Sequence, residues 1–375
     1  RAELVPEEEF VERHLRASRP LVTRAPAQLP LLTWTVPELV RRVGANVVAV
    51  RRNTSKDTYR SGFKYDFERV KFEDYIANLQ AQNPKGRSSY LAAQNLYQVF
   101  PQLADDIDVR PSAAAGASRL PLVTAPVGKL HKGPYMWVAA PGHYEFCHMD
   151  PDDNFLIVST GRRRVRLFSP AGPPALPGLS AFYPHPKGSQ GKTVQARVDM
   201  DAVDLDAFPR FQAVLDAVHE ASESLTDWCM EAELGPGDML FIPAFWWHQV
   251  TTLEASVAVN VFFGDAGDNV FLTKMLDIKS PAHEAFVYWF LNIVEQNRAM
   301  PSFTTMLQHL PEVLYNFFKK QWHEIPSSEQ SEQLVNMVMD YLDLESLPVP
   351  TEKRRHPPVL EIRGLKWRAG GVASK

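Results

Sequence analysis

The sequence predicts a mainly β fold with helices: a core of β-strands, preceded by mixed α/β elements and followed by a helical bundle. Between residues 134 and 263, short segments rich in Val, Ile, Leu and Phe are bounded by Gly and Pro, as is typical of strands. From about residue 270, apolar residues recur at three- and four-residue spacing, which indicates helices. We therefore divide the chain into an N-terminal flanking region, a β core, a helical region and a basic tail, at residues 1–130, 131–265, 266–345 and 346–375.

The composition is that of an ordinary soluble protein and excludes several classes. The formal net charge of −4 gives no global nucleic-acid signature, so a polyanion site would need a local basic patch. Two cysteines, Cys147 and Cys229, are too few for a disulfide framework and favour a reducing compartment, the cytoplasm or the nucleus. No apolar run approaches the roughly 20 residues that span a bilayer, so we expect no membrane partner.

The N-terminal region alternates helices and strands. Thr35 is a plausible N-cap for the helix that follows it, and Gly44 lies just past that helix. Spacing of apolar residues predicts helices at Pro6–Leu15, Thr35–Val43 and Phe72–Gln80, and strands at Pro20–Thr23 and Asn46–Arg51.

The central region carries the strand signals. We predict strands at Tyr135–Ala139, Asn154–Ser159, Arg164–Phe168, Met230–Leu234, Met239–Ile242 and Ser256–Phe263. Residues 160–162 (Thr-Gly-Arg) are a candidate hairpin turn, and residues 236–238 (Pro-Gly-Asp) are a second turn. A Pro/Gly-rich loop from Ser169 to about Lys192 is long enough to be an insertion over a pocket.

The C-terminal region predicts helices whose apolar faces are wider than a lone helix needs. We expect them to pack on the β core or on a second subunit, which makes a homodimer the expected assembly. The tail from Thr351 has seven Lys/Arg against two Glu and little periodicity, so we expect it to be poorly ordered and basic. The helices are expected at Phe271–Met275, His283–Glu295, Thr305–Trp322 and Glu332–Leu342.

Two short motifs suggest a metal site. His148 and Asp150 have one residue between them, and on a strand such residues face the same side. His248 follows the predicted Met239–Ile242 strand. Either motif alone is common by chance, and a histidine beside two tryptophans is usually a core residue. Two histidines and one carboxylate together form the facial triad of non-haem Fe(II) oxygenases, which leaves open positions, whereas a zinc hydrolase of the same ligand types is the less favoured reading.

The context of these motifs resembles the JmjC hydroxylases, whose domain belongs to the cupin type. The resemblance rests on residues 90–94, 137, 148–156, 160–170, 198–211, 235–248 and 257–263. It covers roughly residues 5 to 265 and implies a double-stranded β-helix (jelly-roll) core. It also implies Fe(II) held by His148, Asp150 and His248, which form the catalytic centre, with 2-oxoglutarate and O₂ as cosubstrates.

The same resemblance implies a set of cosubstrate-binding residues. Arg163 occupies the position where the family places a lysine for the far carboxylate of 2-oxoglutarate, and Tyr90, Asn154 and Asn260 match hydrogen-bonding positions. Arginine can replace that lysine because its planar fork binds carboxylates. Arg162 and Arg164 are expected on the opposite face.

Glu145 departs from the family pattern, which has Thr or Ser there. A glutamate would repel the cosubstrate unless an arginine neutralised it, so we expect Glu145 to pair with Arg163. We expect the aromatic residues Trp137, Phe146, Trp246 and Trp247 to wall the pocket.

Three functions remain open at this point. The first is hydroxylation of a protein side chain, with a protein as the partner. The second is hydroxylation of a tRNA, as in the wybutosine branch of the family, which the basic tail favours and the net negative charge opposes. The third is a catalytically inactive cupin that serves as a binding module, suggested by Glu145 and Arg163.

Overall fold

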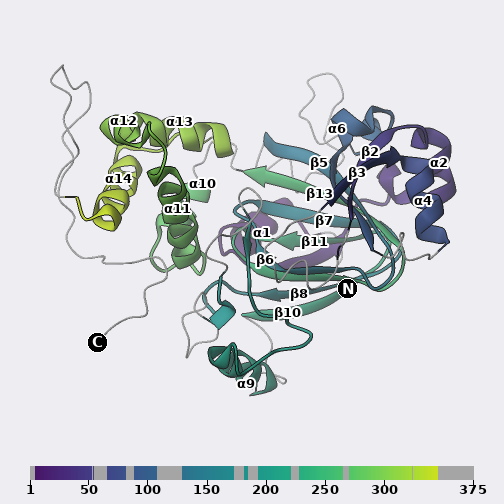
Figure 1. Ribbon diagram of the computed structural model, residues 1–375, viewed down its shortest axis with the longest axis horizontal. Coiled ribbons are helices and arrows are strands. Elements are labelled where there is room, and N and C mark those ends of the chain that lie inside the picture. The colour runs from purple at the N-terminus through teal and green to yellow at the C-terminus, as the bar shows by residue number, and fades with distance from the viewer. Residues whose placement is uncertain are drawn as a thin grey trace. The chain divides into compact units, whose positions relative to one another are not determined.

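The computed structural model of the chain describes residues 5–52, 54, 66–81, 88–107, 129–172, 181–184, 193–220, 228–264, 270–322 and 324–344. The chain divides into two compact units, Arg1–Phe263 and Gly264–Lys375 (Figure 1). Within the described residues, no helix is long and apolar enough to cross a membrane. The predicted tail at residues 346–375 and most of the predicted loop at 169–192 lie outside the described residues.

The first unit is built on two antiparallel sheets, which contain eight and five strands within the described residues. This mainly β arrangement with accompanying helices confirms the predicted jelly-roll class. The larger sheet has the spatial order β1 (Leu21–Arg24), β11 (Asp238–Ile242), β7 (Asp153–Thr160), β13 (Ser256–Gly264), β5 (Lys129–Ala139), β4 (Ser89–Asn95), β2 (Val47–Arg52) and β3 (Asp66–Lys71). The smaller sheet has the order β10 (Cys229–Leu234), β8 (Arg163–Phe168), β12 (Trp247–Thr252), β6 (Tyr144–Met149) and β9 (Val194–Gln195).

Consecutive strands often belong to different sheets. The predicted hairpin at residues 160–162 is wrong, because β7 lies in the larger sheet and β8 in the smaller one. The short connection at Gly161 therefore carries the chain from one sheet to the other. Gly161 has a φ of +74°, and a Cβ there would lie 2.1 Å from the carbonyl oxygen of Ala255. The turn before β11 makes the same kind of crossing, with Gly237 at a φ of +83°.

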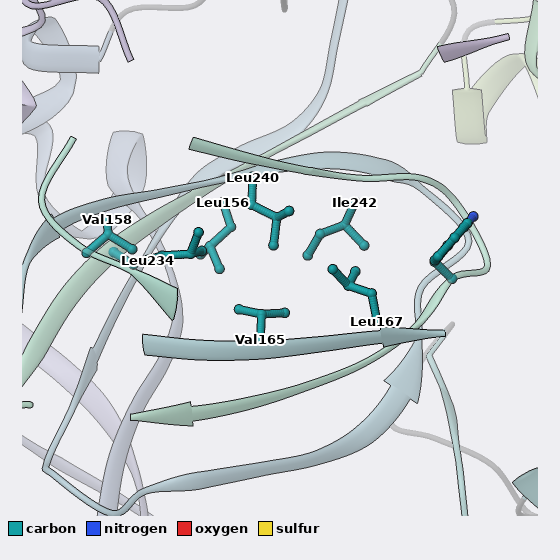
Figure 2. Close-up of a cluster of buried hydrophobic side chains, with 9 residues drawn as sticks. Leu156, Val158, Val165, Leu167, Leu234, Leu240 and Ile242 are labelled. Atoms are coloured by element: carbon teal, nitrogen blue, oxygen red, sulfur yellow. The ribbon is translucent and has the colours of Figure 1, made fainter. Parts of the chain in front are cut away.

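The hydrophobic core lies between the two sheets. Strands β7 and β11 of the larger sheet face β8 and β10 of the smaller sheet, and their alternate side chains point toward one another (Figure 2). Leu167 and Leu240 are fully buried in this cluster. Burial of such aliphatic side chains supplies the main driving force that holds the two sheets together.

The N-terminal elements extend and cover the larger sheet. Strand β1 adds to one edge through pairing with β11, and β2 and β3 extend the other edge. The predicted N-cap is confirmed, because the Thr35 hydroxyl accepts from the backbone N–H of Glu38. The helical elements are α1 (Glu7–Phe10), the π-helix η1 (Val11–Leu15), η2 (Pro30–Thr33), α2 (Val36–Val43), α4 (Phe72–Gln80), α6 (Leu96–Val99), η3 (Pro101–Ile107), η4 (Pro209–Phe211) and α9 (Gln212–Glu220).

The second unit is helical. The single helix predicted at Thr305–Trp322 is two helices, because Pro311 cannot donate a backbone hydrogen bond and starts a new helix. The unit has an aromatic core, in which the rings of Phe271 and Phe318 stack on Trp322. Their ring centroids lie 4.4 and 5.3 Å from that of Trp322. Dimerisation through this unit stays a prediction. Its helices are α10 (Val270–Leu276), α11 (His283–Arg298), α12 (Phe303–Gln308), α13 (Leu310–Trp322) and α14 (Ser328–Leu342).

Candidate metal and cosubstrate site

The three predicted metal ligands meet at one end of the smaller sheet. Strands β6 and β12 pair in a register that sets His148 directly opposite His248, with ring centroids 4.2 Å apart. Asp150 lies one residue beyond the end of β6, so the expectation that both ligands share a strand is wrong for the carboxylate. The chain turns there, and the carbonyl of Asp150 accepts from the backbone N–H of Phe245.

The ligand atoms are close enough to share one ion. Asp150 Oδ2 lies 3.9 Å from His148 Nε2 and 3.7 Å from His248 Nε2. One possible ligand atom from each of the three residues lies within 4.8 Å of the other two. Among the described residues, no other group of three His, Cys, Asp or Glu side chains meets this limit. Two atoms that each lie about 2 Å from one metal can be up to about 4 Å apart, so these separations permit a common ion.

Backbone carbonyls orient both imidazoles. Nδ1 of His148 lies 2.7 Å from the carbonyl oxygen of Phe146, and Nδ1 of His248 lies 2.9 Å from that of Trp246. A carbonyl oxygen can only accept, so each Nδ1 carries the proton. In the neutral form of each ring, Nε2 then has the free lone pair that binds a metal.

The carboxylate has its own orienting donor. The Thr193 hydroxyl donates to Asp150 Oδ1 at 2.7 Å, and the other oxygen, Oδ2, faces the two histidines. Burial, reinforced by the neighbouring His148, lowers the pKa of His248 to about 4. This imidazole is consequently neutral near pH 7 and available as a ligand. The donor set, its tautomers and its orientation fit a divalent iron with open positions.

A cavity of about 340 Å³ opens beside the ligand atoms. Of the residues expected to bind the cosubstrate, Tyr90, Arg163 and Asn260 line this cavity. Asn154 is buried behind the wall, where its side-chain oxygen accepts from the Asn260 amide at 2.7 Å. The apolar part of the wall includes Tyr135, Trp137, Leu156, Ile242, Val250 and Phe262.

The aromatic wall is smaller than expected. Trp137 lines the cavity, but Phe146, Trp246 and Trp247 do not. Trp246 belongs instead to the hydrophobic cluster between the sheets, and Trp247 stacks on Phe182 with centroids 5.1 Å apart. Trp247 directly precedes His248 on β12, so the strand alternation that turns His248 inward turns Trp247 to the other face.

Arg163 is buried in the cavity wall, whereas Arg162 is exposed and Arg164 is half-buried. It is 3% exposed, and its Nε donates to the Ser256 hydroxyl at 2.8 Å and its Nη2 to the Trp137 carbonyl at 3.3 Å. As predicted, Arg162 and Arg164 face the other side, where both pair with Glu233. These two hydrogen bonds hold the buried guanidinium in place. Because both acceptors are neutral, they do not compensate its positive charge, which can then bind an anion.

Glu145 does not pair with Arg163, and that expectation is wrong. Strand β12 runs between β6 and β8, with Val250 opposite Glu145 and Thr252 opposite Arg163, so a whole strand separates the two residues in the sheet. Glu145 Oε1 instead lies 3.5 Å from Arg51 Nη1, and Oε2 lies 3.7 Å from His143 Nε2. Burial opposes the charge on Glu145, but His143 and Arg51 outweigh it and lower the pKa to about 2. Glu145 is therefore an anion in the cavity wall.

Two contributors to this site were missed in the sequence. Arg51 lies on β2, more than 90 residues before the first candidate metal ligand, and no local signal distinguishes it from Arg52. Thr193 follows the long loop and reaches Asp150 through the pairing of β9 with β6. Only contacts between distant segments reveal either residue.

Comparison with known proteins agrees with this geometry. The profile of the cupin-like domain family matches residues 6–269. This chain belongs to that family. Curated relatives include JmjC proteins: the region is 26% identical over 260 residues to lysine-specific demethylase 8 of Xenopus tropicalis, and 27% identical over 188 residues to JmjC domain-containing protein C of Dictyostelium discoideum. It is also 27% identical over 277 residues to tRNA wybutosine-synthesizing protein 5 of Danio rerio. The resemblance to JmjC proteins is thereby confirmed.

The extent of these matches differs between relatives. The alignment covers 68% of this chain and 50% of the Xenopus protein, and 50% of this chain and 38% of the Dictyostelium protein. For the Danio protein it covers 69% of this chain and 73% of the relative. The chain thus spans about half the length of the Xenopus relative. The cupin-like profile, at residues 6–269, covers the β unit that contains the site.

Proposed function

We propose that this cupin-like protein is an Fe(II)- and 2-oxoglutarate-dependent oxygenase that hydroxylates a C–H bond of a protein side chain. The observation that carries the proposal is the convergence of His148, Asp150 and His248 on one cavity that also contains the buried cation Arg163. Bound iron and 2-oxoglutarate would together supply the O₂-dependent oxidising chemistry that no amino-acid side chain provides.

The protein's own residues have distinct tasks in this scheme. His148, Asp150 and His248 would occupy adjacent metal positions and leave the others open. Arg163 would bind the far carboxylate of 2-oxoglutarate, with Tyr90 beside it in the wall. The apolar wall, including Trp137, would exclude water from the reacting atoms.

A protein side chain fits the cavity better than a bulky modified base. About 340 Å³ is near the lower end of ligand cavities, and the cosubstrate must share it. The arginines of β8 also offer little to a phosphate backbone, because Arg164 and Arg166 pair with Glu231 and Glu233 on β10. Substrate recognition through an inserted side chain is the reading that these features support.

A tRNA substrate is the second candidate. Its support is the similarity to tRNA wybutosine-synthesizing protein 5 of Danio rerio, because the alignment covers 73% of that protein. Salt-sensitive retention of tRNA by the full chain, lost on deletion of residues 351–375, would favour this candidate over a protein substrate. If tRNA is not retained even at low salt, where phosphate contacts are strongest, the tRNA reading fails.

Turnover of 2-oxoglutarate tests the proposed function. With Fe(II), O₂ and 2-oxoglutarate, the full chain should release succinate, and His148→Ala should lose at least about a hundredfold of that rate through weakened metal binding. His219→Ala, at an exposed histidine of α9 outside the site, is the matched control and should keep the rate. If no succinate forms and no 2-oxoglutarate binds, the chain is a binding module and the proposal is wrong.

A further inference from the structure

The charged side chains of the cavity come in two pairs of opposite sign. Among the described residues that line it, Arg51 and Arg163 are cations, and Glu145 and Asp150 are anions. Asp150 faces the metal position and Arg163 lies in the wall with neutral partners. Arg51 and Glu145 are the two charged residues of the cavity to which the proposed function gives no role in binding the metal or the cosubstrate.

These two residues come from different sheets and meet across the cavity wall. Arg51 lies on β2 of the larger sheet and Glu145 on β6 of the smaller one, with Nη1 and Oε1 3.5 Å apart. Their side chains are only 16% and 14% exposed, so water screens the pair weakly.

Aromatic and imidazole rings hold this pair in position. The Arg51 guanidinium carbon lies 5.8 Å from the centroid of the Tyr90 ring, and Tyr90 stacks on His143 with centroids 3.8 Å apart. His143 Nε2 in turn lies 3.7 Å from Glu145 Oε2. The carboxylate is consequently flanked on one side by a cation and on the other by an imidazole.

The charge balance of the cavity depends on this pair. The four charged side chains sum to zero, so a divalent metal brings the cavity to +2, the charge that a dicarboxylic 2-oxo acid neutralises. Loss of Arg51 alone would leave Glu145 as an uncompensated anion beside an incoming dianion. Loss of both charges would restore the original sum.

We propose that Arg51 and Glu145 form a compensated ion pair that lets the cavity accept a dianionic 2-oxo acid, and that Arg51 is needed because Glu145 is present. This inference rests on the proposed function, since it concerns the cosubstrate of the same site. It assigns to Arg51 a compensating role in cosubstrate binding, by which it cancels the repulsion between Glu145 and the cosubstrate.

A double-mutant cycle tests this dependence by equilibrium binding. The full chain is loaded with Mn(II), and N-oxalylglycine, an unreactive dianionic mimic of 2-oxoglutarate, is titrated calorimetrically. We expect Arg51→Met to weaken binding by about tenfold or more, as removal of one member of a poorly solvated ion pair does. Arg51→Met combined with Glu145→Gln should return to within about threefold of the unmodified chain.

Matched controls separate charge compensation from damage to the fold. Arg52→Met removes the neighbouring arginine, which pairs with Glu68 at 2.7 Å and does not line the cavity, and should leave binding of the mimic unchanged. Each variant should also bind Mn(II) as the unmodified chain does, because neither Arg51 nor Glu145 is a proposed ligand. The monoanion 2-oxobutanoate should lose less affinity than N-oxalylglycine in Arg51→Met, since it brings one charge fewer.

The outcomes distinguish the two proposals. If Arg51→Met binds the mimic normally, or if the double variant stays as weak as the single one, compensation is overturned while the oxygenase assignment stands. If the unmodified chain binds Mn(II) but neither 2-oxoglutarate nor its mimic, the proposed function itself fails, and the present inference fails with it.

Discussion

Each metal-facing histidine is oriented by a hydrogen bond to the carbonyl two residues before it on its own chain segment. His148 uses Phe146 and His248 uses Trp246, so the tautomer and the ring direction are determined locally. Asp150 differs, because it lies beyond its strand and depends on Thr193 from a distant segment. At the scale of single residues, we therefore expect the carboxylate to be the candidate ligand most sensitive to change elsewhere.

Thr193→Val tests this dependence. The substitution keeps the shape of the side chain but removes the hydroxyl that donates to Asp150 Oδ1. We expect the affinity for Mn(II) or Co(II) to fall by about tenfold or more, the usual effect of losing a group that orients a ligand. The measurement is a metal titration followed by calorimetry or by Co(II) absorbance.

Thr193→Ser is the control, because it retains the donor, and it should stay within about threefold of the unmodified chain. Equal metal affinity in the valine and serine variants would show that the hydroxyl has no orienting role.

At the scale of elements, the short connections between strands decide the architecture. Apolar periodicity correctly indicated strands on both sides of Gly161, since alternation is a local property. It could not tell whether β7 and β8 pair with each other or join different sheets. The structure shows the second arrangement, in which the connection passes close to the backbone of Ala255.

Gly161→Ala is expected to destabilise this crossing strongly. Its φ of +74° disfavours any L side chain, and the new Cβ would lie 2.1 Å from the Ala255 carbonyl oxygen. We expect the free energy of unfolding to fall by about 3 kcal/mol or more, as strain and overpacking add. Chemical denaturation of the full chain measures this loss.

Gly142→Ala separates the two causes. Gly142 has a similar φ of +79°, but nothing lies within 4 Å of a Cβ built there. Only the conformational cost remains, so we expect a loss of about 1 kcal/mol. If both variants lose the same stability, the close approach to Ala255 is not a constraint on the fold.

At the scale of the whole molecule, the proposed metal links segments that are far apart in the sequence. His148 and His248 are separated by 100 positions, yet their strands are direct neighbours. A ligand that binds only the folded state stabilises it by mass action. Metal binding should therefore strengthen the whole β unit, beyond the two strands that hold the histidines.

Addition of Mn(II) tests this coupling. At a free concentration about 100 times Kd, we expect the free energy of unfolding to rise by about 2.7 kcal/mol, with a higher Tm that EDTA reverses. Asp150→Asn should lose most of this gain, because an amide is a weaker ligand than a carboxylate. The melting temperature of His219→Ala should still rise with the metal. No shift in Tm for the unmodified chain at saturating Mn(II) would contradict the assignment of the site.

The sequence by itself identified the three candidate metal ligands, most strands and the helical second unit. These features rest on short motifs and on periodicity, which local geometry imposes on neighbouring residues. His148, Asp150 and His248 could be singled out in this way without knowledge of their contacts.

Only the tertiary structure decided which sheet each strand joins, what surrounds Glu145 and what orients Asp150. Arg51 and Thr193 reach the site from segments whose own residues give no sign of it. The expected pair of Glu145 and Arg163 failed because a strand lies between them, a fact about strand order rather than about residue type. Charge balance in a cavity depends on distances across sheets, and these exist only once the chain has folded.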